Sequence, residues 1–423
     1  MQYEVRSHWL RIFFLANLLP VIIFQIKTGM IIFKNRYFIL PELFKQATKF
    51  SLLKMISLKN MLKVAMLVVC LSCTVCGIAQ LSKKLDSLLL EQPKGQPGFA
   101  LLIEQDGNAL YNKQVGLASL EEVKQIQAST NFRMASLTKQ FTAMGILLLE
   151  KSHQLSANDA IGKWLPGLPA GVGSRVHISH LLTHSSGILD YEELMSPTQT
   201  KQLLDADVLQ LLEQHDTTYF TPGTQFRYSN SGFCLLALII EKVSHQPYAA
   251  FIKQKIFAPL HMDASVVYEA NALIAHRAMG YAKDSTGHTI FSDQSLTSAT
   301  KGDGGVYTSI NDYRKWIKAI QHNSLVNLPA FMQRVHVVAG DVANAYYSAG
   351  WFYNTAGPLV WFHSGSTCGF NNYVIIIPSQ KLSIVFFSNL AEIANLFRHI
   401  LEILHQSGFA DYTNLFALHE LTR

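Results

Sequence analysis

A serine and a lysine stand at helical spacing in Ser136-Leu137-Thr138-Lys139. Residues three apart lie on one face of a helix, so the Lys139 amine can reach the Ser136 hydroxyl. A serine hydroxyl becomes a good nucleophile when a base removes its proton, and a neutral lysine can be that base. Taken alone, this four-residue pattern is explained better by a plain helix cap.

Two further motifs add groups that the same chemistry needs. Tyr-Ser-Asn at 228–230 follows a Gly/Pro turn and precedes another helical segment. Tyr228 can relay a proton there, and Asn230 can hold an amide carbonyl. His-Ser-Gly at 363–365 ends a predicted strand. Its glycine lets a substrate lie against the strand edge, and the N–H of Ser366 can serve an oxyanion hole.

In order and spacing, the three motifs resemble those of the serine β-lactamase and penicillin-binding protein superfamily, specifically the class C β-lactamase-like serine hydrolases. Secondary stretches resemble the same family: Phe132–Ala135, Leu182–Gly187, Ile256–Leu260 and Gly304-Gly305. The resemblance extends from about Gln96 to Gln406, which is nearly the whole chain after its first 79 residues.

The resemblance implies a cycle in which a carbonyl substrate acylates Ser136. Lys139 and Tyr228 would share the base role, passing the proton to the leaving group and later activating the hydrolytic water. Asn230 would orient the substrate, and the backbone N–H groups of Ser136 and Ser366 would form the oxyanion hole. Such a cycle needs no metal and no cofactor.

The third motif departs from the class C pattern, which typically has Lys-Thr-Gly where this chain has His363, Ser364 and Gly365. That lysine helps to bind the carboxylate of a β-lactam, whereas histidine occurs in some D,D-peptidases, D-amino-acid peptidases and esterases. With His363 and Gly365 at the substrate site, we expect a D,D-peptidase-like or esterase-like reaction on a small molecule or peptide, with cell-wall peptides as candidates. The alternatives are a β-lactamase proper and an inactive binding protein that kept the fold. The chain retains both Ser136 and Lys139, which disfavours the inactive binding protein.

The elements that position these motifs come from both ends of the chain. Two apolar runs in Pro97–Gly116 flank Asp106-Gly107, a strong hairpin signal, and a helical pattern covers Leu137–Lys151. Residues 152–300 show mostly helical segments broken by Gly/Pro turns. Later segments predict strands at Leu359–His363, Tyr373–Pro378 and Leu382–Ser388 and a helix at Ala391–His405. This order predicts an α+β fold: an antiparallel sheet flanked by helices, with an α-helical subdomain inserted at about 152–300.

Residues 1–79 are expected to be a leader. They carry ten Lys/Arg and two Asp/Glu, whereas the other 344 residues carry 25 basic and 27 acidic side chains. Residues 61–79 have a basic start, an apolar stretch and small residues, the layout of a signal peptide cleaved after Ala79. This layout predicts a periplasmic or secreted protein. The residues before it are then expected to come from a start codon assigned too far upstream, with the true start at Met55 or Met61. Membrane contact is expected only if the apolar run at 12–26 is retained.

The hydrolase domain is expected at 80–410, followed by a C-terminal tail at 411–423. Three histidines in 177–184 have metal-ligand spacing, but no acidic residue or cysteine lies near them, so no metal site is expected. Asp303 lies in a Gly-rich turn, and the aromatic residues of 346–352 are expected in the core. The balanced charge of the domain predicts no nucleic-acid partner.

Overall fold

The computed structural model describes residues 79–90, 92–270, 272–340, 342–355, 358–410, 412 and 415–421. They belong to the compact unit Val75–Arg423, one of two in the chain. The predicted cleavage site borders the described residues, whereas the signal peptide at 61–78 and the apolar run at 12–26 lie outside them. Among the described residues, no helix is both long enough and apolar enough to span a membrane.

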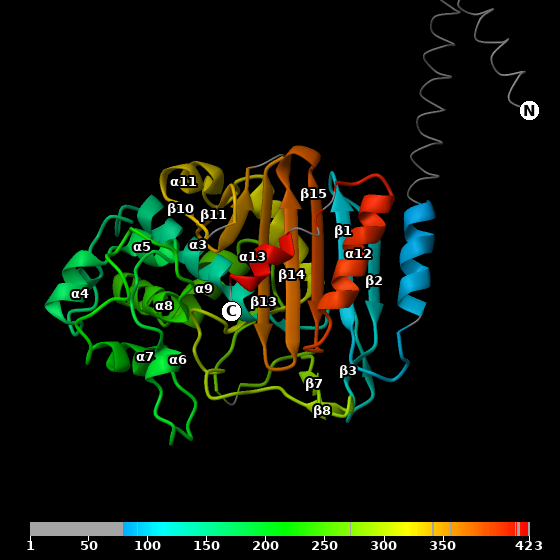
Figure 1. The fold of residues 1–423 in the computed structure, drawn as a ribbon, viewed down its shortest axis with the longest axis horizontal. Coiled ribbons are helices and arrows are strands. Elements are labelled where there is room, and N and C mark those ends of the chain that lie inside the picture. The colour runs from blue at the N-terminus through cyan, green and yellow to red at the C-terminus, as the bar shows by residue number, and fades with distance from the viewer. Residues whose placement is uncertain are drawn as a thin grey trace, which may run out of the picture. The chain divides into compact units, whose positions relative to one another are not determined.

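An eight-stranded antiparallel sheet forms the centre of this unit, in the order β10-β11-β12-β13-β14-β15-β1-β2 (Figure 1). Its strands are β1 (Phe99–Gln105), β2 (Asn108–Val115), β10 (Val337–Val338), β11 (Ala345–Ser348), β12 (Trp351–Asn354), β13 (Val360–Thr367), β14 (Phe370–Ile377) and β15 (Leu382–Ser388). β1 pairs with β15 along its length, so both chain ends contribute to one sheet, as predicted.

The N-terminal hairpin forms at the predicted turn. Asp106 and Gly107 join β1 to β2, with φ values of 50° and 79°. Two successive positive φ values match the right-handed twist of the paired strands, and Asp-Gly adopts them readily. Seven shorter strands lie outside the large sheet: β3 (Leu117–Ser119), β4 (Lys124–Gln125), β5 (Phe132–Arg133), β6 (Val266–Val267), β7 (Tyr281–Lys283), β8 (Thr289–Phe291) and β9 (Val306–Thr308).

Most helices of the inserted segment gather on one side of the sheet in Figure 1. Up to Phe257 the inserted segment contains η2 (Ile161–Lys163), α4 (Ala170–Arg175), α5 (Ile178–Leu182), α6 (Tyr191–Leu194), α7 (Asp205–Leu212), α8 (Asn230–Ser244), α9 (Tyr248–Ile252) and η3 (Lys253–Phe257). The helical subdomain was predicted to reach residue 300. The described residues of 258–300 instead hold turns, loops and β6 to β8, because frequent Ser, Thr and Asp residues, with Gly280 and Gly287, interrupt the helical pattern.

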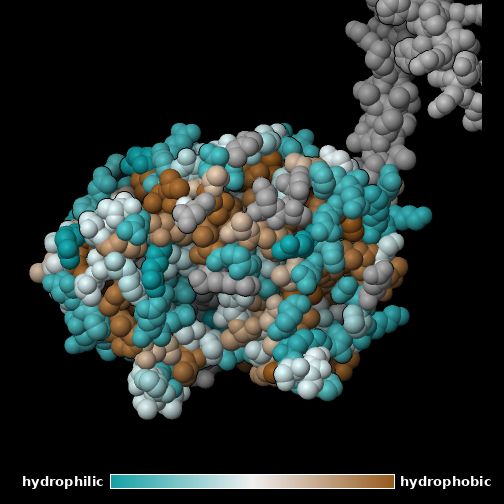
Figure 2. Space-filling model, in the orientation of Figure 1, coloured by the Kyte–Doolittle hydropathy of each residue, from teal (hydrophilic) through white to brown (hydrophobic). Residues whose placement is uncertain are grey.

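The remaining helices lie against the sheet or at its ends. They are η1 (Ala135–Leu137), α3 (Thr138–Lys151), α10 (Ile310–Gln321), α11 (Leu328–Arg334), η4 (Pro378–Gln380), α12 (Ala394–Gln406) and α13 (Phe416–Glu420). On the face of the molecule shown in Figure 2, hydrophobic residues are interspersed with hydrophilic ones rather than gathered into one large patch.

Alternate residues of the central strands belong to two hydrophobic clusters. Leu102, Val374 and Val385 contribute to the cluster that contains α3, whereas their neighbours in sequence contribute to the cluster that contains α12. Every residue of β14 and β15 is buried, which explains why these strands are mostly apolar apart from Asn371, Asn372, Ser383 and Ser388. The predicted apolar stripe of the closing helix is buried as expected; it comprises Ile393, Leu396, Ile400 and Leu404.

The predicted C-terminal tail is part of the core where it is described. Leu415 and Leu418 are buried, and the His419 ring lies 2.7 Å from Ser364 Oγ on β13. The prediction of a separate tail at 411–423 is therefore wrong for these residues. Their apolar side chains bury surface against the sheet, and a segment this short gave too weak a periodic signal to predict that.

Residues 79–90 form a helix whose buried leucines contribute to the same cluster as α12. We predict that Leu85→Ala lowers the free energy of unfolding by about 2–4 kcal/mol, because the fully buried side chain leaves a cavity. Urea unfolding measures the change, with exposed Lys83→Ala as the control. Equal stability of the two variants would show that the helix does not dock on the domain.

Candidate active site

Ser136 and Lys139 lie where η1 passes into α3. Ala135 precedes the serine with a φ of 49°, a conformation that costs free energy for a residue with a Cβ atom. Ser136 is partly exposed, whereas Lys139 is fully buried one helical turn later. Their Oγ and Nζ atoms are 3.0 Å apart, so the predicted contact between nucleophile and base is present.

Lys139 Nζ makes three hydrogen bonds, one for each hydrogen of an ammonium group. It donates to Ser136 Oγ, to Asn230 Oδ1 at 2.8 Å and to the Asp303 carbonyl at 3.1 Å. These acceptors come from η1, the first residue of α8 and the loop before β9. The amine is therefore held at the junction of three segments that are far apart in the sequence.

Tyr228 completes the lysine's surroundings. Its ring centroid lies 4.9 Å from Lys139 Nζ and 4.1 Å from the His184 ring. Its hydroxyl is buried and has no hydrogen-bond partner among the described residues. A buried hydroxyl is costly to leave unpaired, so this oxygen is available for a substrate or a transferred proton.

The third motif brings β13 against the nucleophile. A Cβ atom on Gly365 would overlap Met134 O and would lie 3.2 Å from Ser136 N, so only glycine allows this approach. The ladder with β12 ends at Phe362, which leaves the edge from 363 to 367 unpaired on that side. This is the edge that we expect a substrate to follow, with the exposed Ser366 beside it.

His363 is fully buried and uncharged. Its Nδ1 lies 2.6 Å from the Ser364 carbonyl, which only accepts hydrogen bonds, so Nδ1 carries the proton. Nε2 is then free to accept from the Tyr347 hydroxyl, 3.1 Å away. Burial lowers the pKa of His363 to about 3, and the positive charge of Lys139 also lowers it. The role of His363 as a substrate-binding residue stays a prediction.

Two buried carboxyl groups, Asp205 and Asp303, lie behind Lys139. Asp205 accepts backbone hydrogen bonds from Lys301 at 3.0 Å and Gly302 at 3.1 Å, and so holds the loop that carries Asp303. Asp303 Oδ1 is buried without a partner in the described part of the chain. Burial and the charge of Asp303 raise the pKa of Asp205 to about 7, so Asp205 holds a proton below that pH.

Asp205, Cys234 and Asp303 also form the one group of three potential metal ligands in the described ranges, with ligand atoms within 4.8 Å of one another. Burial and the two carboxylates raise the pKa of the Cys234 thiol well above its usual value. Thiolate is the form that binds a metal, and both Asp205 oxygens already accept backbone N–H groups. A protonated Asp205 and a neutral Cys234 thiol therefore fit this cluster better than a metal.

Glu192, which the sequence analysis did not single out, lies beside Asn230. Its Oε1 accepts a hydrogen bond of 3.1 Å from Asn230 Nδ2. The residue is exposed overall, but its carboxyl group lies against the site. This partial removal from water raises its pKa, as do Asp190 and Asp303. No local signal marks Glu192, because it meets Asn230 only through the fold.

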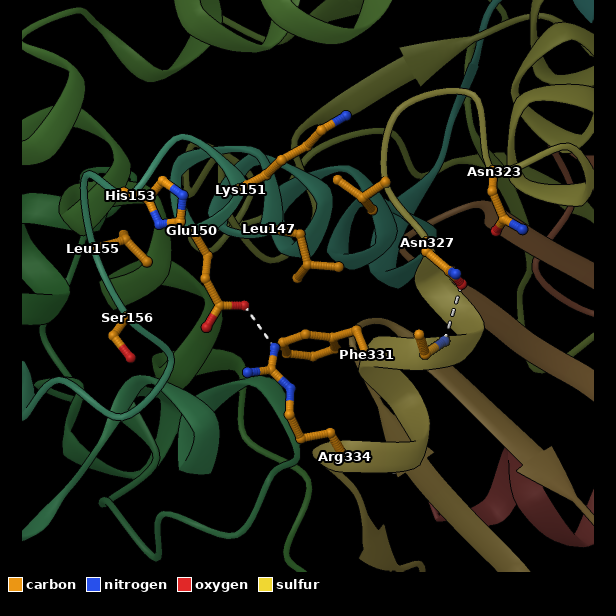
Figure 3. A pocket seen from close by; sticks show the side chains of 12 residues that line it. Leu147, Glu150, Lys151, His153, Leu155, Ser156, Asn323, Asn327, Phe331 and Arg334 are labelled. Atoms are coloured by element: carbon orange, nitrogen blue, oxygen red, sulfur yellow. Dashed lines mark hydrogen bonds and ion pairs between the residues drawn. The ribbon is translucent and has the colours of Figure 1, made fainter.

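A cleft of about 700 Å³ lies at the opposite end of α3 (Figure 3). The ion pair of Glu150 and Arg334, 2.9 Å long, crosses it. A helix rises 1.5 Å per residue, so the cleft is about 20 Å from Ser136. None of the predicted site residues lines it, and it is not the catalytic site.

The remaining sequence predictions have mixed outcomes. His184 Nδ1 accepts the Ser229 backbone N–H at 3.1 Å, and His177 lies 2.6 Å from the Asn158 carbonyl, so both histidines have structural partners. Asp303 does occupy a turn, but its side chain is buried beside the lysine, which the turn pattern could not show. Of the aromatic residues expected in the core, Tyr347, Trp351 and Phe352 are buried, whereas Tyr346 is only partly buried.

A serine hydroxyl 3.0 Å from a buried lysine amine, beside a free strand edge, is the arrangement of the serine hydrolases that include β-lactamases and penicillin-binding proteins. The chain belongs to the Beta-lactamase family, whose sequence model matches residues 85–406.

Individual relatives agree with this assignment. Penicillin-binding protein 4* of Bacillus subtilis (strain 168) is 30% identical over 319 residues, which cover 71% of this chain and 69% of the relative. Protein flp of Staphylococcus aureus (strain COL) is 32% identical over 304 residues, 70% of this chain. The match covers only 60% of the length of the Flp protein.

Solved structures share the fold. The penicillin-binding protein of Bacillus halodurans superposes with a TM-score of 0.66 at 25% identity, covering 76% of this chain and 98% of the other. The D-amino acid amidase of Ochrobactrum anthropi SV3, complexed with D-phenylalanine, gives a TM-score of 0.64 at 21% identity, covering 78% and 99%. At that identity the second likeness concerns the fold alone.

We predict that Gly365→Ala lowers the rate of Ser136 acylation at least about 100-fold, because the new Cβ moves β13 away from η1 and displaces an oxyanion donor. The measurement is the rate of labelling by a fluorophosphonate, with thermal unfolding to confirm folding. Gly232→Ala is the control, since its Cβ would lie 3.6 Å from its nearest neighbour. Unchanged labelling of Gly365→Ala would contradict the predicted role of this strand.

We also predict that the contribution of Asp205 to stability falls as pH rises from about 4 to 7. The unfolded Asp205 side chain loses its proton near pH 3.9, whereas the folded one keeps it until about 7. Folding then takes up a proton at Asp205, which lowers the free energy of unfolding by up to about 1.4 kcal/mol per pH unit in this window. The lowered pKa of His363 acts in the opposite direction, so the test compares two proteins. From pH 5 to pH 8 in urea, the free energy of unfolding should fall less, or rise more, in Asp205→Asn than in the unsubstituted protein. An equal difference in both proteins would contradict the raised pKa.

Proposed function

We propose that the protein hydrolyses an amide or ester bond through an acyl-serine intermediate, in a D,D-peptidase-like or esterase-like reaction. The observation that carries this proposal is the set of three hydrogen bonds that join Lys139 Nζ to Ser136, Asn230 and Asp303. A buried amine 3.0 Å from a partly exposed serine hydroxyl is placed to act as its base.

In the first step Ser136 Oγ attacks the substrate carbonyl carbon while its proton passes to Lys139. The backbone N–H groups of Ser136 and Ser366 stabilise the oxyanion, each donor contributing about 3–4 kcal/mol. The bond to the leaving amine or alkoxide then breaks, and the leaving group takes the proton by way of Lys139 and Tyr228. Water, deprotonated by the same pair, cleaves the acyl-serine and restores the Ser136 hydroxyl.

His363 bears on the choice of substrate. A β-lactam carries a carboxylate, and a neutral buried ring supplies no charge to hold it. We therefore rank D-amino-acid peptides and small esters ahead of β-lactams. Rates on a D-Ala-D-Ala peptide, a p-nitrophenyl ester and a chromogenic cephalosporin test this ranking, which a far higher rate on the cephalosporin would overturn.

We further propose that the protein acts in the periplasm or outside the cell. The basis is the signal-peptide pattern of residues 61–79, which ends where the described residues begin. N-terminal sequencing of protein from its native cell would give Gln80 as the first residue if the segment is cleaved. A retained apolar run at 12–26 would instead indicate a tether.

The catalytic proposal is tested by mass spectrometry of residues 80–423 after fluorophosphonate treatment. We predict a single adduct that is absent in Ser136→Ala. Loss of the adduct in Lys139→Ala, with normal folding, would support the lysine as the base. A folded protein that forms no adduct would instead favour a binding protein that has lost turnover.

A further inference from the structure

We infer that Glu192 selects substrates that carry a positively charged amino group on their acyl part. The inference rests on the proposed function, because it names a property of the substrate of the same site. It follows from how Asn230 is held and from the signs of the charges around it.

The orientation of Asn230 is fixed from both ends. Lys139 donates to Asn230, so the atom that faces Lys139 is the carbonyl oxygen Oδ1. The amide nitrogen Nδ2 then faces Glu192 Oε1 at 3.1 Å. A continuous chain of contacts runs from Ser136 through Lys139 and Asn230 to Glu192, which places the carboxylate beside the residue expected to orient the substrate.

Glu192 retains unused hydrogen-bonding capacity. A carboxylate accepts about four hydrogen bonds, and within the described ranges Asn230 alone donates to this side chain. The next residue, Glu193, differs. It is already paired with Arg227 at 2.8 Å and accepts the Tyr219 hydroxyl at 2.5 Å. Glu192 is thus the exposed carboxylate of α6 that is left for a ligand.

The charges around Asn230 favour a cation. Lys139 must lose its own charge to act as a base, and His363 is neutral. Asp190 and Asp303 act on Glu192 as like charges. The nearby cation Arg227, which acts on Asp190, is already paired with Glu193. An ammonium group beside these acidic groups is attracted, whereas a carboxylate in the same place is repelled.

The test compares D-phenylalanine amide with N-acetyl-D-phenylalanine amide, which lacks the charge. Calorimetric affinities are measured in the Ser136→Ala protein, so the result does not depend on turnover. We predict that the free amine binds at least about tenfold more tightly and that adding Glu192→Gln removes most of this preference. Glutamine keeps an oxygen to accept from Asn230, so the N-acetyl compound should bind the two proteins within about threefold of each other.

Glu193→Gln in the same background is the matched control and should keep the preference. Equal affinities for the two amides, no binding of either, or an equal loss of both in Glu192→Gln would each overturn the inference. The last result would mean that Glu192 only positions Asn230. Failure of the proposed function is seen separately, as the absence of a fluorophosphonate adduct on the protein with Ser136 intact.

Discussion

The burial of one amine, Lys139 Nζ, is the constraint on which the rest of the site depends. A buried ammonium needs an acceptor for each hydrogen, and it finds them on η1, α8 and the loop before β9. Satisfying the amine therefore fixes the nucleophile, the substrate-orienting Asn230 and the Asp303 loop relative to one another. The same three contacts keep the amine next to the hydroxyl that it is proposed to deprotonate.

The sheet supplies the second half of the site through close backbone contact. Gly365 lets β13 approach the turn that carries Ser136, and the ladder to β12 stops at Phe362. A free strand edge is thereby held beside the nucleophile, with both its position and its hydrogen-bonding groups set by the rigid sheet. α13 covers the other side of β13 through the contact of His419 with Ser364.

The charges of this site differ from those of a site that binds an anionic substrate. The position that carries lysine in class C enzymes holds a buried neutral histidine, and Glu192, with Asp190 and Asp303 near it, lies beside Asn230. Asp205 keeps a proton up to about pH 7 and so limits the negative charge near Lys139. Substrate choice, as proposed, follows from this balance of charges more than from the acyl-serine chemistry.

The sequence by itself determined what depends on short-range geometry. The i, i+3 pairing of Ser136 with Lys139, the Asp106-Gly107 turn and the apolar runs of β14 and β15 were all predicted, because neighbours in sequence set them. Only the tertiary structure decided which distant groups meet. Asn230 is 91 residues and Asp303 164 residues from Lys139, and no local pattern encodes such encounters. The role of Glu192, the burial of the Asp303 carboxyl group and the docking of α13 escaped prediction for this reason.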